Sequence, residues 1–104
     1  MYVLTITYPK SANAGFDFDY FRSKHLPKLG EAFQPFGLGY AAVLRGEEGL
    51  RGGDPAYLVT IILSFATEEG ARNAVASDAA RALSADIENF TSVKPVMQFN
   101  TAVP

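Results

Sequence analysis

The sequence contains no cysteine, no tryptophan and a single histidine, His25. The lack of cysteine excludes a disulfide scaffold, a thiolate zinc site, an iron–sulfur cluster and a cysteine nucleophile. A transition-metal site is also excluded, because no second His or Cys side chain is present to share the ion with His25. We therefore expect a protein without a metal and without a bound cofactor.

The sequence also lacks a large excess of either charge and any long apolar run. Nine basic and eleven acidic side chains leave a formal net charge of −2, which provides no broad positive field for nucleic-acid phosphates. The longest apolar run, residues 58–66, is interrupted by Thr60 and Ser64 and is too short to cross a bilayer. The first residues lack the pattern of a signal peptide. We expect no nucleic-acid partner, no membrane and a cytoplasmic location.

What the chain does contain is enough apolar material for one core. Hydrophobic residues occupy 48% of the 104 positions, so we predict a single domain over residues 1–104. Four segments alternate between two sets of side chains with period two and are predicted to be strands: residues 2–8, 38–46, 57–65 and 93–99. The third is apolar on both faces and is expected to be central. The fourth contains Pro95, which cannot donate to a β-ladder and places this strand at an edge or a bulge.

Helix signals fall between these strands. Asp17 is placed to cap a first helix, and Phe16 and Phe21 are spaced to form a hydrophobic staple around that cap. Spacings of three and four predict the core-facing side of this helix: Phe18, Phe21, His25, Leu29 and Phe33. Pro27 removes a backbone donor, so a kink or a break is expected there.

Two further caps follow the third strand. Thr67 precedes two glutamates and predicts a second helix through Val75, and Ser77-Asp78 predicts a short helix over residues 79–83. The order β-α-β-β-α-β indicates a ferredoxin-like α+β fold, a four-stranded antiparallel sheet with helices on one face. Because the strands are apolar on both faces, the second face needs a cover, and a second copy of the chain is the simplest one. We expect a homodimer.

His25 is the residue that carries most information about function. It shares the apolar stripe of the first helix, so its ring points inward beside Pro27. One interpretation is a core histidine that is simply hydrogen-bonded. The other is a neutral imidazole in an apolar pocket between the first helix and the sheet, acting as acid, base or hydrogen-bond donor toward a ligand. Candidate phenolic partners are Tyr8, Tyr40 and Tyr57.

Other polar groups have simpler explanations. Asp17 and Asp19 stand at a helix N-terminus, where capping accounts for both. Three basic residues surround the histidine: Arg22, Lys24 and Lys28. They form either a solvated helix face or a cluster that attracts an anionic ligand. The glycine-rich loop over residues 46–55 lacks the spacing of a phosphate-binding loop.

Two motifs resemble the EthD family. Residues 16–27 are similar to its first-helix pattern F-D-x-x-Y-(4)-H-x-P, and residues 85–98 are similar to its C-terminal pattern A-D-I-x-N-(F/Y)-T-x-x-x-P-x-x-Q. The resemblance implies a dimeric α+β barrel, in which two ferredoxin-like protomers pair sheet against sheet. It also maps the family's helix histidine, aromatic residue and acidic cap onto His25, Tyr20 and Asp17.

The EthD name comes from a gene cluster for ethyl tert-butyl ether degradation, and the wider superfamily includes monooxygenases, isomerases, cyclases, dehydratases and haem-dependent enzymes. Three functions stay open. The first is a cofactor-independent enzyme, or an accessory protein of ether or xenobiotic degradation, that binds a hydrophobic small molecule. The second is a non-catalytic carrier, and the third is a structural dimer with a filled core. For the first, His25 is the candidate acid/base or orienting group and Tyr20 a second candidate site residue. A monooxygenase-, cyclase- or dehydratase-like activity is the further alternative, and haem ligation by His25 has no supporting motif.

Overall fold

The computed structural model describes residues 1–104. Its strands are β1 (Tyr2–Pro9), β2 (Leu38–Arg45), β3 (Tyr57–Phe65) and β4 (Val96–Asn100). Between β1 and β2 the helical segments are α1 (Phe18–Tyr20), η1 (Phe21–His25), α2 (Leu26–Phe33) and η2 (Gln34–Phe36). Between β3 and β4 they are α3 (Glu68–Val75), α4 (Asp78–Asp86) and η3 (Ile87–Asn89).

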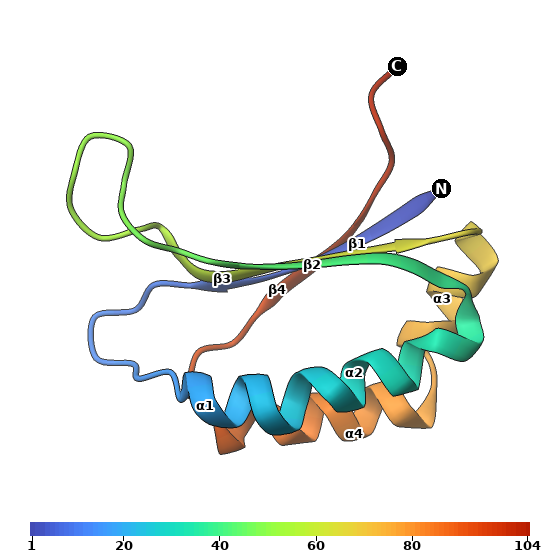
Figure 1. The fold of residues 1–104 in the computed structure, drawn as a ribbon, viewed down its shortest axis with the longest axis horizontal. Helices are drawn as coiled ribbons and strands as arrows, with labels where there is room; N and C mark the ends of the chain where they lie inside the picture. Colours follow the sequence, from blue (N-terminus) through green and yellow to red (C-terminus); the bar gives the residue numbers. More distant parts are fainter.

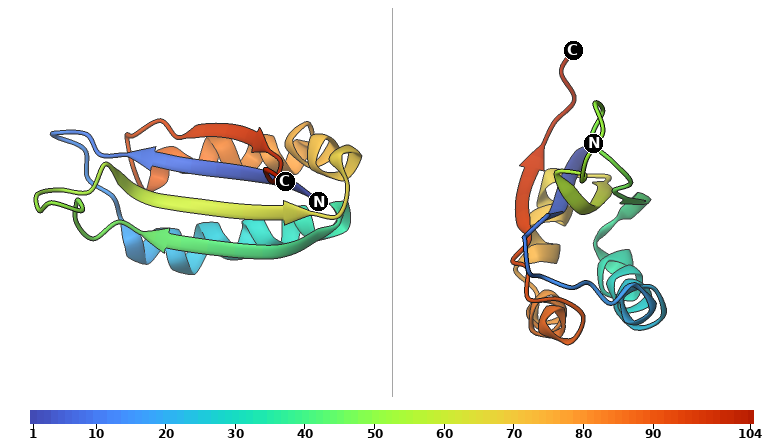
Figure 2. Two further views of the ribbon diagram at one scale, coloured as in Figure 1. Left: turned by 90° about the horizontal axis from the view of Figure 1, so that it is seen from above. Right: turned by 90° about the vertical axis from the view of Figure 1, so that its left-hand side faces the viewer.

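The four strands form one antiparallel sheet in the order β2-β3-β1-β4. All helices lie on one face of it, as Figures 1 and 2 show. The predicted ferredoxin-like α+β fold is confirmed, with β3 in the interior of the sheet and β4 at an edge. Pro95 directly precedes β4, where its missing donor costs no ladder hydrogen bond. None of the helices combines the length and apolarity that crossing a membrane would require.

The first helix begins as the sequence predicts. The Asp17 side chain accepts a hydrogen bond from the backbone N–H of Tyr20 at 3.1 Å. The rings of Phe16 and Phe21 meet edge to face at 5.1 Å between centroids, which forms the predicted staple. Phe21 and His25 are buried, whereas Phe18 is only half-buried.

The helix does not break at Pro27, and the irregularity that the structure shows lies within a turn before that proline. The helical backbone continues through Pro27, and the irregularity lies one turn earlier, where η1 is a π turn and the N–H of Leu26 donates to the carbonyl of Phe21. In a π turn the bonding partner is five residues back rather than four. The carbonyl of Ser23, four residues before Pro27, therefore sits in a widened turn that accommodates the missing N–H without ending the helix.

The last helices also follow their caps. Thr67 accepts from the N–H of Gly70 at 3.0 Å, and Ser77 accepts from the N–H of Ala80 at 3.2 Å. The helix capped by Ser77 is longer than predicted, since α4 continues past Leu83 to Asp86. The extra turn of α4 matters for function, because it carries Asp86 to the site described below.

The hydrophobic core lies between the helices and the sheet. It consists of fifteen buried hydrophobic residues, contributed by β1, β3, the helices and the segment before β4. At one end the core is aromatic: Tyr8, Phe16, Phe21 and Phe90 pack with ring centroids 5.1–6.2 Å apart. A loop of residues 46–56 projects from the sheet (Figure 1), and none of its residues lines the pockets described below.

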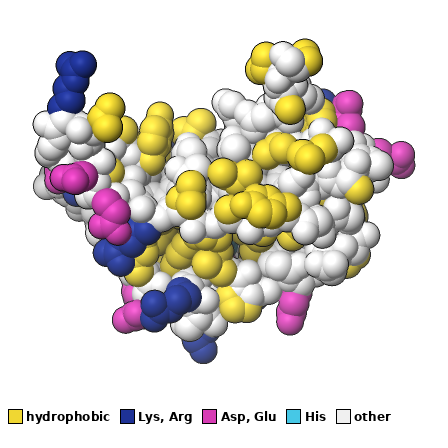
Figure 3. Space-filling view, turned by 45° about the horizontal axis from the view of Figure 1, so that its top comes forward, with side chains coloured by type: hydrophobic (Ala, Val, Ile, Leu, Met, Phe, Trp, Pro, Cys, Tyr) yellow, Lys and Arg dark blue, Asp and Glu magenta, His cyan; other side chains and the backbone are white.

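The opposite face of the sheet has no helix over it. The strand register places on this face Val3, Thr5, Thr7, Tyr40, Ala42, Leu44, Leu58, Thr60, Ile62, Ser64, Val96, Gln98 and Asn100. None of these residues is charged, and Tyr40, Leu44 and Val96 are 53–62% exposed. Figure 3 shows hydrophobic side chains gathered on this side, with charged ones toward its margins. The second face is therefore uncharged, with apolar side chains among threonine, serine, glutamine and asparagine, and we call it the open sheet face.

Candidate functional site

Asp86, at the end of α4, is the centre of the site. Its Oδ2 lies 2.9 Å from Nδ1 of His25. Its Oδ1 accepts from the hydroxyl of Tyr20 at 2.7 Å and from Nδ2 of Asn89 at 2.9 Å. His25 and Asp86 are 3% and 9% exposed, so this is an internal pair rather than a surface one. The two motif segments thus meet at a single carboxylate, with His25 and Asp86 sixty-one positions apart.

The electrostatics of the His25–Asp86 pair determine which of the two side chains carries the shared proton. Burial alone would raise the pKa of the Asp86 carboxyl. Its three hydrogen bonds outweigh burial, together with the positive charge of Lys28, and lower this pKa to about 2. The ionised carboxylate only accepts, so Nδ1 of His25 must donate to it. The hydrogen bond that Tyr20 donates to Asp86 raises the pKa of the phenol, because ionisation would remove the donated proton and place a second negative charge beside the carboxylate.

The other ring nitrogen of His25 faces a cavity between the helices and the sheet. Nε2 has no hydrogen-bond partner in the chain. Every side-chain nitrogen or oxygen that is fully buried does have a hydrogen-bond partner, so Nε2 is not fully buried. Nε2 is therefore in contact with open space, and His25 lines a cavity of about 80 Å³. With Nδ1 protonated, the lone pair of a neutral imidazole sits on Nε2 and points to this space.

The cavity is lined mainly by apolar side chains. They come from β1, the first helix, β3, α3, α4, η3 and β4: Leu4, Ile6, Tyr8, Leu29, Phe33, Ile61, Val75, Ala80, Leu83, Ile87 and Met97. Ser84 is the one other polar residue besides His25 and the hydroxyl of Tyr8. Such a lining, with few convergent polar groups, is typical of small-molecule sites.

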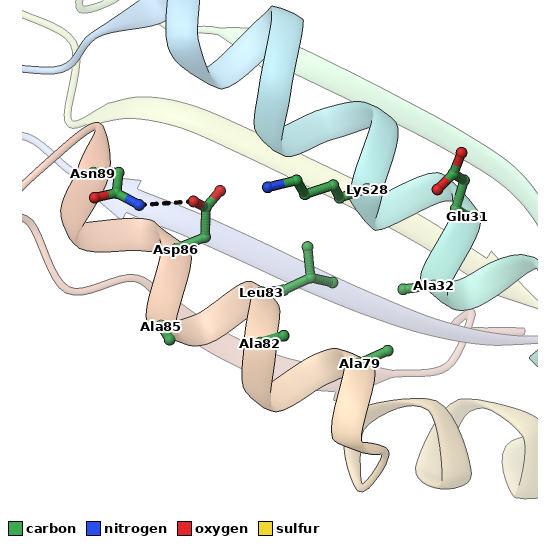
Figure 4. A pocket seen from close by; sticks show the side chains of 9 residues that line it. All are labelled: Lys28, Glu31, Ala32, Ala79, Ala82, Leu83, Ala85, Asp86 and Asn89. Carbon is green, nitrogen blue, oxygen red and sulfur yellow. Dashed lines mark hydrogen bonds between the residues drawn. The ribbon is translucent and has the colours of Figure 1, made fainter.

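A wider groove of about 520 Å³ lies on the outer side of the same helices. Figure 4 shows it between α2 and α4, with Lys28 and Asp86 facing one another across it and Asn89 bonded to Asp86. Alanines 79, 82 and 85 of α4 leave it hollow. Leu83 lines both the groove and the cavity, and therefore stands between them.

The structure brings some of the candidate residues from the sequence to the site and places others away from it. His25 and Tyr20 are brought together through Asp86, while Asp17 and Asp19 remain at the helix start, as capping predicts.

The remaining candidates divide in the same way. Tyr8 lines the cavity, whereas Tyr40 lies on the open sheet face and Tyr57 lines no pocket near His25. Of the basic residues near His25, Arg22 and Lys24 lie on an exposed helix face, which agrees with the interpretation as a solvated face, and Lys28 approaches the site. No three His, Cys, Asp or Glu side chains group closely enough to hold a metal ion.

Asp86 and Asn89 are the site residues that reasoning from the individual residues missed. Both belong to the C-terminal motif, which was the available signal. They are also three residues apart on one helical turn, so they share a face and are spaced to hydrogen-bond to each other.

Comparison with known proteins finds similar structures but no close relative in sequence. No protein-family model matches the sequence, and no curated protein matches it significantly. Among solved structures, an EthD-like protein from Ralstonia eutropha superposes with a TM-score of 0.86 at 26% identity, covering 99% of this chain and 92% of that one. An ethyl tert-butyl ether degradation (EthD) family protein from Bacillus halodurans gives 0.77 at 19% identity, with 99% of both chains covered.

A third similar structure is SnoaB, a cofactor-independent oxygenase from Streptomyces nogalater, with a TM-score of 0.68 at 15% identity and coverage of 99% and 93%. The fold is that of the dimeric α+β barrel superfamily. Over almost its whole length the chain is similar in structure to these two EthD proteins, in agreement with the resemblance carried by its two motifs.

Proposed function

We propose that this protein binds a small, mainly apolar molecule in the cavity beside His25 and acts on it by acid–base chemistry without a cofactor. The observation that carries the proposal is the buried His25–Asp86 pair with Nε2 directed into that cavity. A carboxylate on Nδ1 selects the tautomer in which Nε2 is basic and stabilises the imidazolium that forms when Nε2 takes a proton.

The surrounding residues then have positioning roles. Tyr20 and Asn89 each donate to Oδ1 of Asp86 and so leave Oδ2 for His25. The ring of Phe21 stacks on the imidazole at 5.8 Å between centroids, and the ring of Phe90 lies tilted against it at 4.7 Å. An oriented acid–base group of this kind contributes roughly 10²–10⁴ to a rate.

The comparisons support this type of chemistry. SnoaB, which shares the fold, is a cofactor-independent oxygenase. The EthD resemblance suggests that the substrate is an apolar ether, another xenobiotic compound or a related molecule. An accessory role in such a degradation, or a monooxygenase-, cyclase- or dehydratase-like reaction, would use the same pocket. A non-catalytic carrier would need the cavity but not a basic nitrogen in it.

We further propose a homodimer in which a second copy covers the open sheet face. Its strand residues are all uncharged and about half of them are apolar, with Tyr40 and Leu44 more than half exposed. Sheet-to-sheet packing would bury these side chains and leave the helices, and hence the cavity, on the outside. We place the protein in the cytoplasm on the sequence grounds given above.

The test has a binding part and a catalytic part. Ligand-detected NMR with cyclopentane, toluene and ethyl tert-butyl ether should show binding to the wild-type protein. Ala80→Leu, which fills the cavity, should abolish it, whereas Ala82→Leu, on the groove side of α4, should not. Binding that survives Ala80→Leu would contradict the proposed cavity.

For turnover of whatever molecule binds, His25→Ala should lower the rate by roughly 10²–10⁴ and leave the dimer intact. His25→Asn retains a hydrogen-bonding group but cannot titrate, so it separates proton transfer from orientation. Binding without any turnover would favour the carrier.

A further inference from the structure

A second polar group faces the cavity, and neither the fold nor the His25–Asp86 pair accounts for it. Tyr8, in β1, is 1% exposed, and its hydroxyl makes no hydrogen bond within the chain. Every fully buried side-chain oxygen has a hydrogen-bond partner, so the unpartnered hydroxyl of Tyr8 is not fully buried. The small exposed part of Tyr8 therefore includes its hydroxyl. Tyr8 lines the same cavity as His25, so the hydroxyl is reached from that cavity.

Tyr8 and His25 are held by the same two rings. The Tyr8 ring lies 6.2 Å from Phe21 and 5.9 Å from Phe90, and the His25 ring lies 5.8 and 4.7 Å from these same rings. The cavity thus has a fixed donor on its sheet side and a fixed base on its helix side, in a mainly apolar lining. Burial raises the pKa of Tyr8, which keeps its hydroxyl protonated and able to donate.

A donor and a base that face one apolar space fit a particular ligand chemistry. A ketone or aldehyde with a hydrogen on the carbon next to its carbonyl group offers an acceptor oxygen and a removable proton, with apolar carbons around them. We propose that Tyr8 donates to the carbonyl oxygen of such an enolisable compound while Nε2 of His25 removes the neighbouring proton. This inference rests on the proposed function, and deepens it by naming the substrate class and the second catalytic residue.

The step is balanced without any co-reactant. The C–H bond next to the carbonyl breaks, its electron pair forms the C=C bond of the enolate, and the carbonyl oxygen takes up the negative charge. The proton passes to Nε2, and the imidazolium is stabilised by Asp86 through Nδ1. The hydroxyl of Tyr8 stabilises the charge that develops on oxygen, as an oxyanion-hole donor does. The Nε2 proton then exchanges with solvent, and return of a solvent-derived proton, or of a deuteron in D₂O, from Nε2 to carbon regenerates the ketone.

The size of the cavity limits the substrate. A space of about 80 Å³ corresponds to roughly five to eight water-sized volumes. A five-membered cyclic ketone is of that order, whereas a fused-ring molecule would require Leu83 to move and open the cavity to the groove.

Cyclopentanone in D₂O is therefore the probe, and hydrogen–deuterium exchange next to its carbonyl, followed by proton NMR, is the readout. The wild-type protein should accelerate exchange. Tyr8→Phe should lower this acceleration by roughly 10²–10³, and His25→Ala should lower it by a similar or larger factor. Tyr57→Phe, the same change at a tyrosine that lines no pocket beside His25, should leave it unchanged.

A stability measurement separates catalysis from folding. Tyr8→Phe breaks no hydrogen bond in the chain, so its urea midpoint should equal or exceed that of the wild-type protein. Exchange that survives in Tyr8→Phe but is lost in His25→Ala would overturn the role of Tyr8 and leave the proposed function standing. An absence of exchange in the wild-type protein would overturn the carbonyl class, and binding of cyclopentane and toluene would then decide the proposed function on its own.

Discussion

Replacing Asp86 by Asn tests the electrostatic centre of the site. The pKa of Asp86 is about 2 in the folded protein, against an ordinary value of 3.8. At about 1.4 kcal/mol for each pKa unit, this difference corresponds to about 2 kcal/mol of folding free energy. Asn has nearly the same shape, but it carries no charge, and its NH2 group places a donor where one of the two carboxylate oxygens accepts from Tyr20 or His25. We expect Asp86→Asn to lower the free energy of unfolding at pH 7 by about 2 kcal/mol.

The pH dependence gives this prediction its sign. A carboxyl with a depressed folded pKa stabilises the protein above its unfolded pKa, and that contribution is lost as the pH falls through the folded pKa. The wild-type protein should therefore lose about 2 kcal/mol between about pH 4 and pH 2 from this group, and Asp86→Asn should not show that part of the loss. Urea unfolding followed by circular dichroism, at one protein concentration and several pH values, measures both quantities.

The matched control is Asp19→Asn. Asp19 also pairs with a basic residue, but its side chain is 91% exposed, so this change should cost well under about 1 kcal/mol. Equal losses in the two variants, or an unchanged acid-unfolding profile in Asp86→Asn, would refute the idea that the internal carboxylate is stabilised as an anion.

Two further predictions concern the fold and the assembly. Gly70→Ala should destabilise the protein by more than about 1 kcal/mol in urea unfolding, because a Cβ would collide with the carbonyl oxygen of Phe36; Gly30→Ala, where a Cβ meets no atom, should instead be neutral or stabilising by up to about 1 kcal/mol. Leu44→Glu on the open sheet face should shift light-scattering mass from dimer to monomer, whereas Leu50→Glu in the exposed loop should not; a dimer that tolerates Leu44→Glu would place the interface elsewhere.

The elements of the fold were predictable because their signals are local. Alternation over residues 57–65 fixes β3, and the caps Asp17, Thr67 and Ser77 fix three helix starts. The end of α4 was not predictable in the same way, because Ala85-Asp86-Ile87 contains no glycine or proline to stop the helix. Its extra turn depends on packing against α2 and on the hydrogen bonds of Asp86.

The candidate site was half predictable. His25 could be placed facing the core from its spacing along the helix, since this is a property of one segment. Its partner could not be deduced, because Asp86 is one of eleven acidic residues and lies sixty-one positions away. The free hydroxyl of Tyr8 is also a property of the assembled cavity, and nothing in the alternation of β1 distinguishes Tyr8 from a tyrosine with a partner.

The π turn explains how one carboxylate reaches two side chains of the first helix. Tyr20 and His25 are five residues apart, which in a regular α-helix turns them about 140° away from one another. In η1 the backbone bond spans five residues, so a residue and its fifth successor lie much closer to the same face of the helix. Both side chains can then point to Asp86, at 2.7 and 2.9 Å. The irregularity beside Pro27 is therefore part of the site, because without the wider turn Tyr20 and His25 would face different sides of the helix.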